Sequence, residues 1–323
     1  MRRFFNIVFG GLLAIGVGIG IAYVGAFGWR ALKPQLAKIS GISFSNVAAV
    51  LITPTIDGTS ISGTKRTIRY TASEEEDLIN AATQALPVSY DKGISAKAYI
   101  LKNLTRGDTT ISHNSDQLLP IASLTKLVTA VVARRLIDPD ERITIGQNVM
   151  ATYGNTAGFK VGETFKASDL LYPLLIVSSN DSAEAFALAY GRPKFLKAMN
   201  DFVQSIGAYR TYFDDTSGLS ALNVSTANDL AIIVEWIRKN DPTIIETTDL
   251  KSKTIRSHTW INPTHFLSWS YYIGGKNGYT TEANRTGVSL FALGKNKNVY
   301  AIIVLGSGNR DADVLKLLEK VRE

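Results

Sequence analysis

The sequence of this 323-residue chain predicts an α+β fold in which helices pack on an antiparallel sheet. Strand-like segments stand near both ends of residues 89–323, helical segments fill the middle, and the last two strands form a hairpin. Strands and helices separated in this way along a chain are typical of a layered fold with helices on an antiparallel sheet.

The predicted helices have boundary residues of the expected kinds. Proline is tolerated at a helix start, glycine follows a helix end, and serine or threonine caps an N-terminus. Pro120, Pro193, Gly207, Ser225 and Thr226 occupy such positions. The helices predicted from them and from the apolar spacing cover residues 122–136, 181–190, the stretch between Pro193 and Gly207, 227–239 and 311–322.

The predicted strands lie at the two ends of the region. Residues 96–103 form the first one. Residues 286–293 and 299–305 flank the turn-rich segment 294–298, which is the pattern of a β-hairpin. Residues 173–177 are apolar and lead into the helix predicted at 181–190.

The N-terminus begins with an apolar run from Phe4 to Trp29, in which Asn6 is the one strongly polar side chain. A membrane-spanning helix takes about 20 such residues. Arg2 and Arg3 precede the run and favour a cytoplasmic N-terminus. The sequence therefore predicts a single-pass anchor over residues 1–29.

A secretory signal peptide is the alternative for the same segment. Its apolar core is usually about 7–15 residues and ends at a small-residue cleavage site, for which residues 24–26 qualify. The length of the run favours the uncleaved anchor. Residues 30–88 are predicted to be a spacer or a small accessory segment.

Composition excludes several kinds of site. The chain has no cysteine, so disulfides, thiolate metal sites and cysteine nucleophiles are excluded. The net charge is +7, but the basic residues are scattered, and no nucleic-acid partner is expected. His113, His258 and His265 form no metal-ligand motif and no recognisable part of a Ser-His-Asp triad, so neither a metal nor another cofactor is expected.

Ser123 and Lys126 form a Ser-x-x-Lys motif at the start of the helix predicted over residues 122–136. Their spacing places both side chains on one helix face. A serine hydroxyl needs a base to become a good nucleophile, and a lysine whose pKa is lowered can act as that base. The motif alone is weak, because an exposed helix face is the ordinary setting of such a pair.

Ser178 and Asn180 lie in a second motif, Ser-Ser-Asn, at another predicted helix start. Serine and asparagine are common caps at this position, which is the structural explanation. The functional explanation is that Ser178 relays a proton to a leaving amine, while Asn180 holds Lys126 or a substrate carbonyl.

The third motif is the glycine-rich segment 274–280, in which Lys276 stands between glycines. Glycine permits close approach of a ligand to the backbone, and Lys276 adds a positive charge. A glycine-rich turn with an exposed lysine is the alternative. The candidate substrate-binding residues of this segment are Lys276, Asn277, Gly278, Tyr279 and Thr280.

The three motifs in this order are the signature of penicillin-recognising serine enzymes. The chain resembles the low-molecular-mass D-alanyl-D-alanine carboxypeptidases of peptidase family S11, over about residues 94–321. The resemblance implies a β-lactamase/transpeptidase-like fold with a helical subdomain, and a serine D,D-peptidase domain over residues 89–323. The segments that carry the resemblance are 119–127, 174–183, 211–219, 225–231 and Asn309–Arg310.

The resemblance implies a role for each site residue. Lys126 accepts the proton of Ser123, which attacks the penultimate D-Ala carbonyl, although the identity of the base is left open. The backbone N–H groups of Ser123 and Tyr279 form the oxyanion hole. Ser178 and Lys276 help to protonate the departing D-Ala.

The same resemblance implies the partners. Lys276, Thr280 and Arg310 bind the terminal carboxylate of a peptidoglycan stem peptide that ends in D-Ala-D-Ala, and β-lactams are covalent inhibitors. The expected location is the cell membrane, with the catalytic domain extracytoplasmic. Asn277 departs from the family, which usually has threonine there, and its side chain lacks the hydroxyl.

Three other functions remain open. A D,D-endopeptidase would use the same residues on cross-links. A non-catalytic sensor of muropeptides or β-lactams would be expected to lack Ser123, Lys126 or Lys276, and all three are present. A class A β-lactamase needs a glutamate for deacylation, and its usual Glu-x-x-Leu-Asn setting does not occur.

Overall fold

The structure, a computed structural model, describes residues 93–154 and 156–322. The predicted anchor over residues 1–29 and the spacer over residues 30–88 lie outside the described residues. Within the described ranges, every helix is too short or too polar to cross a bilayer.

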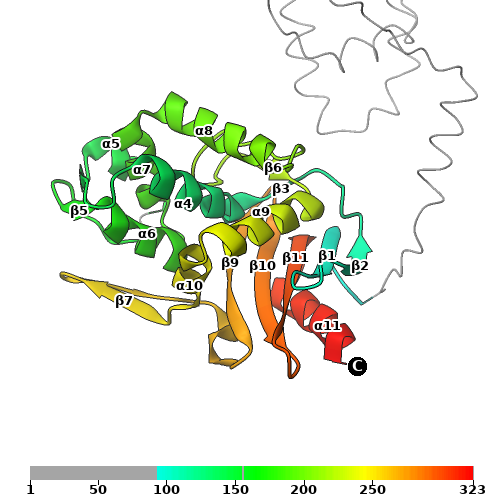
Figure 1. The fold of residues 1–323 in the computed structure, drawn as a ribbon. Helices are drawn as coiled ribbons and strands as arrows, with labels where there is room; N and C mark the ends of the chain where they lie inside the picture. The colour runs from blue at the N-terminus through cyan, green and yellow to red at the C-terminus, as the bar shows by residue number, and fades with distance from the viewer. Residues whose placement is uncertain (1–92, 155, 323) are drawn as a thin grey trace, which may run out of the picture. The chain divides into compact units, whose positions relative to one another are not determined.

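A five-stranded antiparallel sheet forms the centre of this region (Figure 1). The strand order is β2-β1-β11-β10-β9, so a strand from the start of the region pairs with one near its end. Ala98 lies opposite Leu305 in that pair. The strands are β1 (Ala98–Asn103), β2 (Thr109–His113), β9 (Tyr272–Thr280), β10 (Asn284–Leu293) and β11 (Asn298–Ser307).

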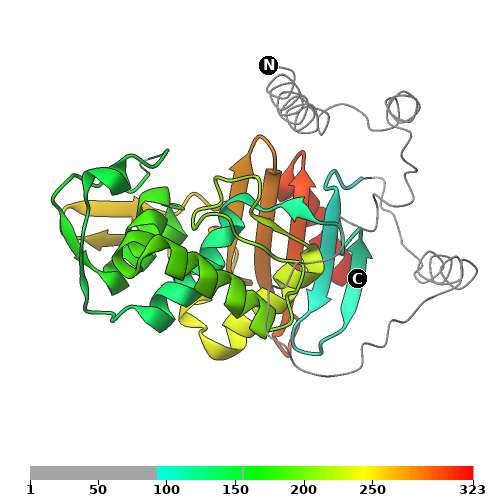
Figure 2. The ribbon, with the colours of Figure 1, turned by 90° about the horizontal axis from the view of Figure 1, so that it is seen from above.

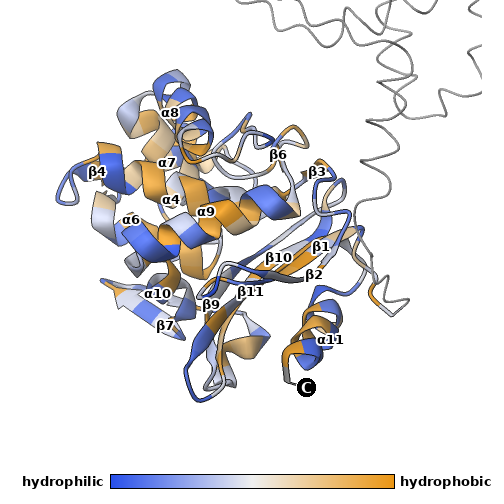
Figure 3. Ribbon diagram, turned by 45° about the vertical axis from the view of Figure 1, so that its right-hand side comes forward, coloured by the Kyte–Doolittle hydropathy of each residue, from blue (hydrophilic) through white to orange (hydrophobic). Residues whose placement is uncertain are grey.

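Helices cover both faces of the sheet, and this explains the unbroken apolar run in β11. Side chains alternate between the faces of a strand. Ala301 and Ile303 pack into the core that contains α9 (Ala227–Asn240), whereas Ile302 and Val304 pack with α11 (Arg310–Arg322). Figure 3 shows both apolar and hydrophilic residues along these two helices, as expected for amphipathic helices on a sheet.

A helical subdomain lies beside the sheet and appears in green in Figure 2. It provides the helices that carry the first two motifs. Its helices are α4 (Thr125–Leu136), α5 (Gln147–Met150), α6 (Ala167–Ile176), α7 (Asn180–Tyr190) and α8 (Arg192–Ser205).

Shorter elements connect the two layers. A 3-10 turn, η2 (Ala122–Leu124), precedes α4, and α10 (Thr243–Asp249) packs against β9. The others are β3 (Leu119–Pro120) paired with β6 (Val224–Ser225), β4 (Arg142–Thr144) with β5 (Thr164–Lys166), β7 (Ser252–Ile255) with β8 (His258–Ile261), and the 3-10 turn η3 (His265–Ser268).

Most of the predicted elements are confirmed, with bounds shifted by a few residues. One difference concerns residues 173–177, which were expected only to lead into a helix. Pro173 instead lies inside α6, three residues before that helix ends at Ile176. A proline in a helix removes one backbone hydrogen bond. Here that bond is missing from the last turns of α6, and the burial of its apolar side supports the helix.

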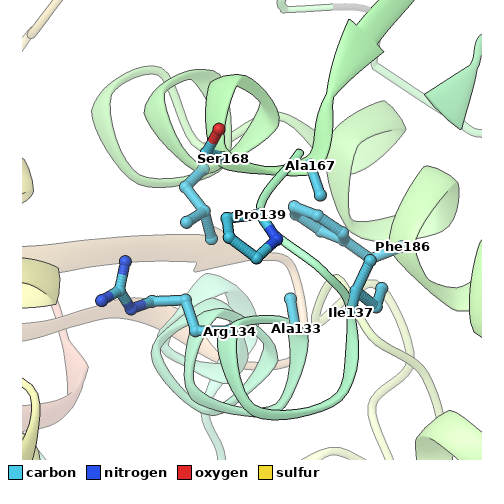
Figure 4. A pocket seen from close by; sticks show the side chains of 8 residues that line it. Ala133, Arg134, Ile137, Pro139, Ala167, Ser168 and Phe186 are labelled. Atoms are coloured by element: carbon cyan, nitrogen blue, oxygen red, sulfur yellow. The ribbon is translucent and has the colours of Figure 1, made fainter. Parts of the chain in front are cut away.

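A small apolar pocket of about 110 Å³ lies between α4 and α6 (Figure 4). Ala133, Ile137, Leu171 and Phe186 line it, together with the aliphatic ring of Pro139. None of the residues predicted for the catalytic site lines this pocket.

Candidate active site

Ser123 lies in the 3-10 turn η2, directly before α4, so the predicted helix over residues 122–136 begins with a tighter turn than expected. Ala122 has a positive φ of 49°, which is uncommon for a residue with a side chain. Lys126 follows one turn later on the same face, and its Nζ lies 3.0 Å from Ser123 Oγ. The nucleophile and its candidate base are therefore in hydrogen-bonding contact.

The Lys126 amine is fully buried. Besides Ser123, it donates to Asn180 Oδ1 at 2.7 Å and to the backbone oxygen of Ser217 at 2.5 Å. Burial holds the pKa of Lys126 well below its ordinary value, and the nearby charge of Lys276 lowers it further. A lysine with a lowered pKa can be neutral near pH 7 and can accept a proton.

At the start of α7, one residue caps the helix and the next one contacts Lys126. Ser179 is the N-cap, and its Oγ accepts from the backbone N–H of Ser182 at 3.0 Å. Asn180 is left to hold Lys126 and to donate through Nδ2 to the backbone oxygen of Tyr153 at 2.8 Å. Ser178 has a positive φ of 59°, a conformation that is costly for a non-glycine residue and is found mostly at functional sites.

Lys276 lies on β9 rather than in a turn, and it is buried. Its Nζ donates to Ser178 Oγ at 2.8 Å and to the backbone oxygen of Asn277 at 2.8 Å. Burial, and secondly the charge of Arg310, lowers the pKa of Lys276 to about 7. A second serine–lysine pair thus lies beside the first, since the charge of Lys276 acts on Lys126.

Gly278 allows β9 to lie against the backbone of the nucleophile. A Cβ at this position would be 2.9 Å from the backbone N of Ser123 and 2.6 Å from Thr286 Oγ1. Thr286 in turn donates to the backbone oxygen of Ile121 at 3.0 Å. The strand residue that follows is Tyr279, whose backbone N–H is the second donor expected for an oxyanion hole beside that of Ser123.

The segment after α8 supplies a contact that the sequence analysis did not assign. The carboxylate of Asp215 accepts from the backbone N–H groups of Ser217 and Gly218 at 2.6 and 2.5 Å. Asn223 donates to the Asp215 backbone oxygen at 2.9 Å and to Thr125 Oγ1 at 3.0 Å. This network fixes the Ser217 carbonyl that Lys126 contacts. The available signals were the family resemblance of segment 211–219 and its dense run of Asp, Thr, Ser and Gly, which is typical of tight turns.

The other candidate residues make their hydrogen bonds and ring contacts outside the two serine–lysine pairs, although the charge of Arg310 acts on Lys276. Thr280 Oγ1 accepts from the backbone N–H of Ala283 at 3.1 Å, in the turn between β9 and β10. The Tyr279 side chain is exposed, next to the guanidinium of Arg285. Arg310 donates through Nε to Asp311 at 2.7 Å at the start of α11.

The three histidines lie elsewhere. His113 stacks on Tyr99, and the other two pair with Glu163 and Asp311. The part of the chain that the structure describes contains no group of three or more His, Asp or Glu side chains able to hold a metal ion.

Comparison with protein families identifies the chain. The family model described as D-alanyl-D-alanine carboxypeptidase matches residues 81–308, which contain all three motifs. The chain belongs to peptidase family S11. Both serine–lysine pairs lie within the matched residues.

Two curated relatives are named for different D-alanyl-D-alanine peptidase activities. The S11 chain is 30% identical to D-alanyl-D-alanine carboxypeptidase DacD of Salmonella typhimurium, over 70% of this chain and 62% of that protein. It is 36% identical to a D-alanyl-D-alanine endopeptidase of Haemophilus influenzae, over 45% of this chain and 52% of that protein. The chain therefore spans less than two thirds of the length of either relative.

Solved structures confirm the predicted fold. Penicillin-binding protein D2 of Listeria monocytogenes, in its cefotaxime-bound form, is 25% identical, with a TM-score of 0.65 over 72% of this chain and 99% of that one. The S11 chain therefore has the α+β fold of the penicillin-binding proteins, with helices on an antiparallel sheet and a helical subdomain.

Proposed function

We propose that this S11 protein is a serine D-alanyl-D-alanine carboxypeptidase that trims peptidoglycan stem peptides through an acyl-enzyme on Ser123. The observation that carries the proposal is the fully buried Lys126 amine, 3.0 Å from Ser123 Oγ. Burial holds the pKa of Lys126 well below its ordinary value and so favours the neutral amine, which is the base that a serine nucleophile requires.

Acylation follows from these contacts. Lys126 takes the proton from Ser123 Oγ, which bonds to the penultimate D-Ala carbonyl carbon. The backbone N–H groups of Ser123 and Tyr279 stabilise the negative oxygen that develops, and one such donor contributes about 2.7–4 kcal/mol to lowering the barrier. The C–N bond then breaks, and the acyl group remains on Ser123.

The leaving amine needs a proton at that moment. Ser178 Oγ lies 2.8 Å from Lys276 Nζ, and the pKa of Lys276 is about 7, so this pair can hold or deliver a proton near neutral pH. Ser178 passes the proton to the D-Ala nitrogen and regains one from a lysine. Water then attacks the ester on Ser123, releasing the shortened peptide and restoring the serine hydroxyl.

β-Lactams are proposed as covalent inhibitors by the same route, because their strained amide replaces the D-Ala-D-Ala bond. The cefotaxime-bound relative supports this expectation. The class A deacylation glutamate is not found in its usual sequence setting, so the acyl-enzyme is expected to persist.

The proposed location is the cell membrane, with the catalytic domain on the extracytoplasmic side, where the cell wall lies. The apolar run from Phe4 to Trp29 supports an anchor. Fractionation of cells that produce the full chain tests this: the protein should stay with membranes after a high-salt wash, and recovery in the soluble fraction would contradict the anchor.

The experiment that tests the function is release of D-alanine. The full-length protein is incubated with a synthetic pentapeptide ending in D-Ala-D-Ala, and with a cross-linked muropeptide dimer. D-Alanine should appear from the pentapeptide with the wild type and not with Ser123→Ala. A folded wild type that releases none would overturn the proposal.

An endopeptidase is the second candidate, favoured by the 36% identity to a protein of that name. The same assay separates the two activities. Cleavage of the dimer with a kcat/KM well above that for the pentapeptide would assign the endopeptidase function instead.

A further inference from the structure

β9 presents different chemistry on its two faces. Side chains alternate along a strand, so Lys276 and Asn277 point to opposite sides. Lys276 reaches Ser178 in the helical subdomain. Asn277 points the other way, where its Nδ2 lies 3.5 Å from Thr264 Oγ1 in the segment before η3.

Arg310 lies on the same side as Asn277. Gly287 of β10 stands directly opposite Asn277, and residues paired across antiparallel strands share a face. A Cβ on Gly287 would be 2.6 Å from Arg310 Cδ, so the arginine side chain fills the space that glycine leaves. A guanidinium has five N–H donors, and its contact with Asp311 does not use all of them.

Thr264 is held in place from both sides. Asn262 donates through Nδ2 to the backbone oxygens of Thr248 and Leu250 at 2.8 and 3.1 Å, and its Oδ1 accepts from the Thr264 N–H at 3.1 Å. On the other side, His265 Nδ1 lies 2.7 Å from Asp311 Oδ2. A side chain on such a braced segment loses little freedom when it binds a ligand.

A small cavity of about 80 Å³ joins this group to the catalytic one. Ser178 and Lys276 line it together with Thr264 and Asn277. The amine of the departing D-Ala is formed at Ser178, and its carboxylate is only two bonds away from that amine. A carboxylate this close to Ser178 can reach the Thr264–Asn277 side of the cavity.

We propose that Thr264 is a substrate-binding residue whose hydroxyl, with the amide of Asn277, binds the terminal carboxylate of the substrate beside Arg310. The inference rests on the proposed function and deepens it. A hydroxyl that accepts a hydrogen bond from Asn277 keeps its own hydrogen for the carboxylate. Thr264 thus supplies a hydroxyl that the Asn277 side chain lacks.

The test compares Thr264→Val, which keeps the side-chain shape, with Thr264→Ser, which keeps the hydroxyl. Hydrogen bonds to charged groups change binding by roughly tenfold or more. Thr264→Val is therefore expected to lower kcat/KM for the pentapeptide about tenfold, and Thr264→Ser to stay within about twofold of wild type. Adding Asn277→Thr to Thr264→Val should restore much of the loss.

Each outcome decides the inference. The melting temperature of every variant is measured first, so that loss of folding is not mistaken for loss of binding. Equal effects of Thr264→Val and Thr264→Ser, or wild-type kcat/KM in Thr264→Val, would refute a binding role for the hydroxyl while leaving the proposed function intact. Absence of D-alanine release by the wild type would instead refute the proposed function, and this inference with it.

Discussion

Lys126 and Lys276 are both buried, and each contacts a serine hydroxyl. Burial of an ammonium group disfavours its charged form, and two close amines disfavour it further. Burial lowers the pKa of both groups; the charge of Lys276 lowers that of Lys126 further, and the charge of Arg310 lowers that of Lys276 further. In the proposed mechanism, one of these serine–lysine pairs supplies the nucleophile and the other supplies the proton relay.

Asp181 shifts the pKa of Lys126 in the opposite direction. It follows Asn180 in the first turn of α7 and is fully buried, and its carboxylate oxygens have no hydrogen-bond partner among the described residues. Burial raises the pKa of Asp181 to about 6, an effect that the charge of Lys126 partly offsets. At neutral pH its negative charge raises the pKa of Lys126.

Asp181→Asn should therefore move the rising limb of the acylation pH profile to lower pH. Removing the negative charge lowers the pKa of Lys126, so the amine becomes neutral, and able to take a proton, at a lower pH. The measurement is the rate of β-lactam acylation against pH for both proteins. An unchanged limb, in a variant that still folds, would show that Asp181 does not act on this titration.

At the scale of elements, two glycines with similar backbone conformations differ in what surrounds them. Gly218, with φ of 88°, lies so close to η2 that a Cβ would be 1.9 Å from the backbone oxygen of Ala122. Gly207, with φ of 91°, has nothing within 4 Å of that position. The segment held by Asp215 therefore packs directly against η2, the turn that carries Ser123.

Gly207→Ala should cost about 1–2 kcal/mol of unfolding free energy, from backbone conformation alone. Gly218→Ala should cost more and should also slow acylation at least tenfold, because the clash displaces the backbone beside Ser123. Denaturant unfolding and acylation rates provide the comparison. Equal losses of stability and unchanged acylation in both variants would argue against close packing of this segment on the nucleophile.

The sequence predicted the elements that depend on local patterns. Capping residues located α7 and α9, and the turn-rich segment 294–298 located the hairpin of β10 and β11. It did not predict that α6 runs through Pro173, because the burial that supports that helix is a tertiary effect. Nor did it place Asp215 and Ser217 at the site, since the contact of Ser217 with Lys126 joins residues 91 positions apart and is set by the folded layers.

For the whole domain, the buried lysines link stability to pH. Between about pH 7 and the ordinary lysine pKa of 10.5, Lys276 is neutral in the folded state and protonated in the unfolded state. Unfolding then takes up a proton, so the free energy of unfolding rises with pH across this window. Lys126 acts with the same sign, because its pKa is lowered too.

Lys276→Met should flatten this rise by up to about 1.4 kcal/mol per pH unit. Lys295→Met, which changes an exposed lysine in the loop between β10 and β11, is the matched control and should leave the slope unchanged. Denaturant unfolding from about pH 7 to pH 9.5 measures both slopes. Parallel curves for wild type and Lys276→Met would mean that Lys276 is protonated in the folded protein.

Covalent labelling of the full-length protein by a fluorescent penicillin tests most directly whether Ser123 is the nucleophile. We expect a stable label on the wild type, detected by gel fluorescence and located on Ser123 by peptide mass spectrometry. The label should be absent from Ser123→Ala. A folded wild type that takes up no label, or a label that persists in Ser123→Ala, would contradict the assignment of Ser123 as the nucleophile.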